Sequence, residues 1–128
     1  MMDIYSNQAD FEAEISILTA AEGGRSHPPH NYIRWDLGYP DRTSLDPIYM
    51  IWPVFVDQFG NPFPRGVPIE GTVTARMFIV IREMVDFHKQ HIFVGSTFSC
   101  HEGSRVVARG SVTKLLALSD RAGPSNPQ

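Results

Sequence analysis

The sequence has a single cysteine, Cys100, and no long hydrophobic run. One cysteine excludes an internal disulfide framework, which stabilises many small secreted domains. No apolar stretch approaches the about 18 residues that a membrane-spanning helix needs. The first residues, Met1 to Tyr5, lack the basic and long apolar regions of a signal peptide. We therefore expect a cytoplasmic protein without a membrane partner.

The chain also lacks an excess of basic residues, since 11 basic and 14 acidic side chains give a net charge of −3. Proteins that bind nucleic acid usually show a basic excess, because neutralised phosphates supply much of the affinity. DNA is therefore not an expected partner, and RNA would need a local basic patch. Nine of the 11 basic residues are arginines, which suit both anion recognition and structural ion pairs.

Strand patterns dominate what is present, and no long segment has the period of an amphipathic helix. Residues 11–17 alternate apolar and polar side chains, which predicts a strand with one wet face. Pro53 predicts an edge or bulged strand, because proline cannot donate to a ladder. Residues 84–90 are a turn or one helical turn. The other expected strands cover 32–37, 49–56, 72–81, 91–99 and 105–116. Six short strands favour a small antiparallel barrel or sandwich.

Glycines mark two places where the backbone has special requirements. One residue of the Gly23-Gly24 pair is predicted to have a positive φ, because the chain must turn sharply before Arg25. Gly110 predicts a bulge or a close contact inside the last strand. We expect one domain over residues 1–128, with an ordered core over about 10–118 and a flexible tail over 119–128.

Two segments at the ends of this domain carry a resemblance. The first runs F-E-A-E at 11–14 into E-G-G-R at 22–25, with a proline at position 28. The second runs E-G-S-R-V-V-A-R-G-S-V-T-K at 102–114. Together, in this order, they resemble the opening and closing motifs of the C-terminal β-barrel domain of elongation factor Tu. The resemblance spans 11–116, and the middle, from 39 to 90, matches poorly.

This resemblance implies an all-β fold, a small six-stranded antiparallel closed barrel. In the family, that domain carries no catalysis, contacts the T stem of aminoacyl-tRNA, packs on the GTPase domain and helps to dock the exchange factor. The chain has no G-x-x-x-x-G-K-[ST] phosphate loop and is too short for a GTPase domain. The implied function is a stand-alone, non-enzymatic binding module.

The family's contact positions can be carried over residue by residue. His101 stands where the family has an arginine, and Ser104 replaces a glycine. Because histidine is mostly neutral at pH 7, the change at 101 weakens the expectation of tRNA binding. The candidate partner-binding residues are Arg25, Arg34, His101, Glu102, Gly103 and Arg105.

A protein partner, such as a translation factor, is the favoured expectation, and tRNA or another RNA is the alternative. For docking on a protein, the aromatic middle offers Trp52 and Phe55 as apolar anchors. For RNA, the arginines would contact the backbone.

A small metal-dependent or hydrolytic enzyme is the second alternative, and it would use His88, His91, Cys100 and His101. The histidine spacing matches no known zinc pattern, and adjacent strand residues point to opposite faces. We therefore expect no catalytic residue, no metal and no cofactor.

Overall fold

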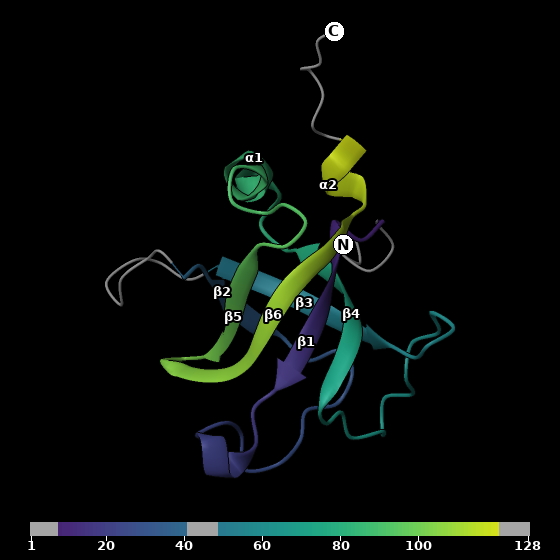
Figure 1. Ribbon diagram of the computed structural model, residues 1–128, viewed down its shortest axis with the longest axis vertical. Coiled ribbons are helices and arrows are strands. Elements are labelled where there is room, and N and C mark those ends of the chain that lie inside the picture. Colours follow the sequence, from purple (N-terminus) through teal and green to yellow (C-terminus); the bar gives the residue numbers. More distant parts are fainter. Residues whose placement is uncertain (1–7, 41–48, 121–128) are drawn as a thin grey trace, which may run out of the picture.

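A computed structural model describes residues 8–40 and 49–120 of the chain. Six strands form a closed antiparallel barrel in the order β1-β4-β3-β2-β5-β6 (Figure 1). The predicted closed six-stranded barrel is therefore confirmed. The strands are β1 (Phe11–Ile17), β2 (Trp35–Gly38), β3 (Tyr49–Val56), β4 (Thr72–Ile79), β5 (Thr97–Glu102) and β6 (Arg105–Leu115).

The first strand behaves as its alternation predicts. Phe11, Ala13 and Ile15 are fully buried, whereas Glu14 and Ser16 are exposed. β1 pairs with β4 on one side and with the last strand, β6, on the other, as the barrel prediction requires. These three apolar side chains enter the interior of the barrel, where burial stabilises them, whereas Ile17 at the end of β1 is only partly buried.

The last strand departs from simple alternation because it contains a bulge. The register of β5 with β6 shifts between Cys100, which is opposite Ala108, and His101, which is opposite Val106. Val107 is therefore the extra residue of the pair. Simple alternation predicts Val106 on the face of Ala108 and Val107 on the other. That prediction is wrong, since Val107 is fully buried and Val106 is only half-buried.

Gly110 makes the close contact predicted for it. A Cβ atom at this position would lie 2.3 Å from the ring of Phe98, so only glycine fits. The Phe98 ring lies over the glycine and meets Phe11 edge to face, with 5.9 Å between ring centroids. The glycine therefore creates the space that an aromatic pair fills inside the barrel.

Pro53 lies neither in an edge strand nor at a bulge, so that prediction is wrong. β3 pairs with both β2 and β4, and its register with β4 runs unbroken through Pro53. The proline is tolerated because β2 begins at Trp35, opposite Ile51, and so does not lie beside Pro53. Backbone N–H groups two residues apart point to the same side of a strand, and Phe55 N donates to the Asn31 side chain on that side. The missing N–H of Pro53 therefore faces a gap in the ladder.

Residues 91–96 differ most from their predicted structure, whereas the turn or helical turn predicted for 84–90 is confirmed. Residues 91–96 form turns instead of the first part of a strand, because Gly95 has φ 93° and the Ser96 hydroxyl donates to Phe93 O. The helical segments within residues 8–40 and 49–120 are the 3-10 turns η2 (Ala20–Glu22) and η3 (Arg82–Met84) and the short helices α1 (Val85–Lys89) and α2 (Ala117–Asp120). Residues 121–128 of the predicted flexible tail lie outside the described residues.

One large core cluster fills the barrel and continues under α1. Figure 1 shows α1 and α2 at one end of the barrel and the coiled η2 segment at the other. The α1 end contains contacting aromatic rings, namely Tyr39, Tyr49, Phe87, His88 and His91. The η2 end carries the loop that contains Arg25.

Candidate functional site

The turn before Arg25 is fixed by a local capping arrangement. Thr19 N donates to the Glu22 carboxylate at 2.8 Å, and Glu22 N donates to the Thr19 hydroxyl at 3.2 Å. Gly23 then adopts φ 93°, which confirms the predicted positive φ. Gly24 is needed for a different reason, since a Cβ there would lie 2.4 Å from Leu18 O. These restraints set the direction in which Arg25 leaves the turn.

Arg25 reaches across to the β5–β6 hairpin. Its Nη1 donates to Glu102 Oε2 at 3.0 Å, and the two side chains are 30% and 36% exposed. The same carboxylate oxygen accepts from Trp35 Nε1 at 2.9 Å. An ion pair this exposed contributes little to stability, so its main effect is positional. It fixes the guanidinium and the carboxylate in one arrangement at the surface.

Arg105 completes the link from the opposite direction. Its Nη1 donates to Gly24 O at 3.1 Å, and Gly103 turns the hairpin with φ 62°. Four of the six predicted site residues, Arg25, Glu102, Gly103 and Arg105, therefore come together from segments about 80 residues apart. We call these four residues the turn–hairpin cluster.

The other two predicted site residues have different neighbours. The Arg34 guanidinium lies over the Trp52 ring on β3, 4.3 Å from the centroid. The His101 ring bonds to the Ser99 hydroxyl at 2.7 Å and lies against Gly38. Partial burial lowers the pKa of His101 despite the nearby Asp36, and Arg109 lowers it further. The imidazole at position 101 is therefore mostly neutral at pH 7.

The residues of the enzyme alternative do not form one site. Cys100 is fully buried in the core, and burial raises the pKa of its thiol. His88 is buried beside Tyr39, with its Nδ1 2.5 Å from the hydroxyl, and the His91 ring lies tilted against the same tyrosine. Burial, followed by the charge of His91, lowers the pKa of His88 to about 4. Within residues 8–40 and 49–120, no three His, Cys, Asp or Glu side chains are grouped to hold a metal.

The two aromatic residues predicted as anchors for a protein partner, Trp52 and Phe55, differ in their exposure. Phe55 is fully buried and meets Trp35 edge to face, so its expected role as a surface anchor is wrong. Trp52 remains half-buried on the outside of β3, under Arg34. Strand parity explains the difference, since the two residues lie an odd number of positions apart.

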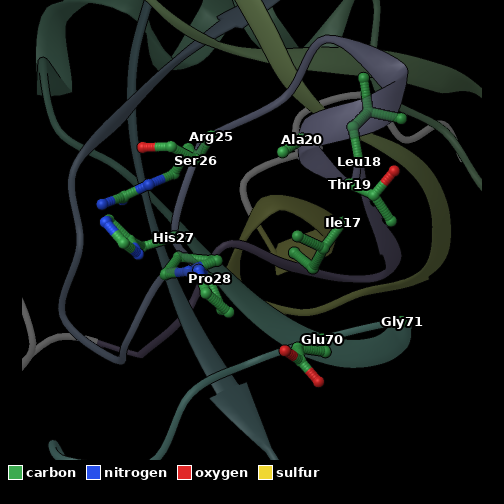
Figure 2. A pocket seen from close by; sticks show the side chains of 11 residues that line it. Ile17, Leu18, Thr19, Ala20, Arg25, Ser26, His27, Pro28, Glu70 and Gly71 are labelled. Carbon is green, nitrogen blue, oxygen red and sulfur yellow. The ribbon is translucent and has the colours of Figure 1, made fainter.

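Two neighbouring pockets share Arg25, His27 and Pro28. The first, about 350 Å³, is bounded by residues 17–20, 25–29 and 70–71 and is shown in Figure 2. We call it the loop pocket. The second, about 390 Å³, includes Tyr32, a non-glycine residue with φ 71°. Such backbone strain in a non-glycine residue is uncommon and is enriched at functional sites.

Sequence reasoning did not identify the walls of the loop pocket. Glu70 and Gly71 immediately precede β4, far along the chain from residues 17–29. The one sequence signal was the Pro28-Pro29 pair, which favours a stiff extended segment. Nothing in that signal identifies the partner segment, which tertiary pairing brings in through an Ile69 N–H donated to Pro29 O at 2.8 Å.

Comparison with known protein families finds none that matches this sequence, and comparison with curated proteins finds no relative. None of the helices within the described ranges is long and apolar enough to cross a lipid bilayer.

Proposed function

We propose that this chain is a stand-alone binding module, related to the C-terminal barrel domain of elongation factor Tu, that acts through protein–protein contacts without catalysis. The observation that carries the proposal is the convergence of Arg25, Glu102, Gly103 and Arg105 at the surface of a closed barrel. These residues come from the two segments that carry the resemblance. A rigid surface of this kind suits recognition, because little side-chain freedom is lost when a partner binds.

The contacts of the arginines favour a protein over RNA. Arg25 is paired with a carboxylate, and Arg105 donates to a backbone carbonyl. Each arginine therefore has less of its guanidinium edge available for phosphates than a free side chain has. The net charge of −3 also repels a polyanion at long range. A protein surface with mixed charges and apolar anchors needs no free guanidinium edge and is not repelled by the net charge.

The test is affinity capture from a host lysate with matched charge variants. Arg105→Gln and Lys114→Gln remove the same charge from the same strand, but only Arg105 belongs to the turn–hairpin cluster. We expect RNase-treated lysate to yield a specific protein with the wild type and with Lys114→Gln, and much less of it with Arg105→Gln. Equal capture by both variants would contradict the proposed surface.

The RNA alternative has its own measurement. Labelled tRNA is titrated with the full chain at 50 mM and 200 mM salt, followed by fluorescence anisotropy. If the arginines read an RNA backbone, each of Arg25, Arg34 and Arg105 contributes about one unit to the slope of log affinity against log salt. We expect weak binding. Tight binding at physiological salt that is lost in Arg25→Ala would replace the protein partner with RNA.

A further inference from the structure

The loop pocket has walls that are fixed before any ligand arrives. Ile17 N donates to Gly71 O at 2.9 Å, which closes the β1–β4 side. Ile69 N donates to Pro29 O at 2.8 Å, which holds the proline segment in place. Gly24 N donates to Thr19 O at 2.9 Å within the capped turn. A cavity with such restraints keeps its shape, so a ligand bears little cost for ordering it.

The pocket combines an apolar floor with separated charges. Ile17, Leu18, Ala20 and the two prolines supply the apolar surface. Its volume of about 350 Å³ lies toward the small end of ligand sites. A cavity of roughly 150 Å³ is large enough for benzene, so this pocket holds an aromatic ring with a short chain.

The charges of the pocket lie on different sides. Figure 2 shows Arg25 and His27 together at the left of the pocket and the Glu70 carboxylate apart from them, below Ile17. Within the described part of the chain, the hydrogen bond of the Arg25 side chain is the one that Nη1 gives to Glu102. A guanidinium has five N–H donors, so four remain for a ligand. The imidazole of His27 adds a further donor on the same side.

We propose that the loop pocket binds a monoanionic carboxylate attached to an apolar body, with the carboxylate at Arg25 and His27 and the apolar body over Ile17. Arginine pairs with carboxylates through parallel hydrogen bonds, which fixes orientation as well as charge. A dianion such as phosphate fits less well, because Glu102 already pairs with Arg25 and the Glu70 carboxylate also lines the pocket. This inference shares Arg25 with the proposed function, whereas Glu102, Gly103 and Arg105 do not line the pocket.

The probe for the test is 3-phenylpropionate, with 3-phenylpropanamide as its uncharged counterpart. Each is titrated into the isotopically labelled full chain while amide chemical shifts are recorded. We expect shifts confined to residues 17–29 and 69–71, with the acid binding roughly ten- to a hundredfold more tightly than the amide. Absence of shifts at millimolar acid, or equal affinity for acid and amide, would overturn the proposal.

Two arginine variants separate the pocket from the turn–hairpin cluster. Arg25→Gln removes the cation that lines the pocket, and we expect it to reduce affinity for the acid to that for the amide. Arg105→Gln removes a cation of the same cluster that does not line the pocket, so we expect it to lower affinity for the acid much less than Arg25→Gln does. Glu102→Gln keeps Arg25 and removes its competing carboxylate, so the acid binds at least as tightly as to wild type. An Arg25→Gln protein with a native spectrum and undiminished affinity would contradict the proposed role of Arg25.

The same carboxylate chemistry occurs in free small acids and at the C-terminus of a polypeptide. A tripeptide ending in phenylalanine, with a free or an amidated C-terminus, distinguishes the two sources. Tighter binding of the free-ended peptide than of 3-phenylpropionate identifies a polypeptide terminus as the ligand. Tighter binding of 3-phenylpropionate identifies a small acid. If the lysate experiment captures no specific protein while 3-phenylpropionate still binds, the proposed function is rejected and the proposal for the loop pocket is retained.

Discussion

The buried ion pair between Asp10 and Arg82 gives the sharpest test of how this barrel is held together. Asp10 precedes β1 and is fully buried, whereas the Arg82 side chain is 35% exposed. Asp10 accepts from Arg82 Nη1 and Nη2 at 2.9 and 3.2 Å, and also from Ile79 N at 2.8 Å. The carboxylate therefore ties the start of β1 to the end of β4.

Arg82→Met removes the cation and leaves the carboxylate buried. Removing one partner of a buried ion pair costs about 3–5 kcal/mol, because the remaining charge keeps its desolvation penalty. Asp10→Ala removes the charge itself, leaves the Ile79 N–H without its acceptor, and lets the partly exposed Arg82 turn to water. We expect it to cost about 2–4 kcal/mol, from the orphaned donor and a small cavity.

A double-mutant cycle measures the coupling within this pair. Once Asp10 is alanine, we expect Arg82→Met to cost less than about 1 kcal/mol, so the coupling energy exceeds about 2 kcal/mol. The free energies of unfolding come from urea titrations followed by tryptophan fluorescence, compared at equal slopes. Arg76→Met is the control, because Arg76 pairs at 3.7 Å with Glu12 at a more exposed site. The same cost for Arg82→Met in both backgrounds would refute the reasoning.

Three further predictions concern the core and the turn. The free energy of unfolding falls by about 3 kcal/mol as the pH drops from 6.5 toward 4, because His88 is protonated at a higher pH in the unfolded chain than in the folded one. We expect His88→Phe to flatten this part of the pH profile, and parallel profiles for the wild type and the variant would contradict the prediction. Asn31→Leu removes the buried amide that bonds Phe55 N and O, which costs about 2–4 kcal/mol and speeds hydrogen exchange of the Phe55 amide. Gly23→Ala costs about 1 kcal/mol through its positive φ, whereas Gly24→Ala costs more, because its Cβ would lie 2.4 Å from a backbone oxygen; thermal melts that rank the two in reverse would show that φ governs both.

The amino-acid pattern alone predicted the bounds and the buried face of a strand where one face meets water and the other meets the core. β1 begins and ends where its alternation predicts, since polar residues face water and apolar residues face the core along its whole length. The prediction that the sheet closes into a barrel came from the six short strands and from the resemblance carried by the two end segments. The sequence also identified a requirement for glycine within the 23–24 pair and at 110, because turn and close-contact positions favour that residue.

Only the tertiary structure decided what depends on pairing between distant segments. The bulge at Val107 inverts the expected faces of β6 near the hairpin, and no local pattern marks it, because three apolar residues follow one another there. Pro53 is tolerated inside a paired strand because β2 stops short and the side chain of Asn31 takes its place. The loop pocket arises in the same way, since Glu70 and Gly71 meet residues 17–29 only when β4 pairs with β1. Local sequence fixes which way a side chain alternates, but the register between strands decides which residues become neighbours.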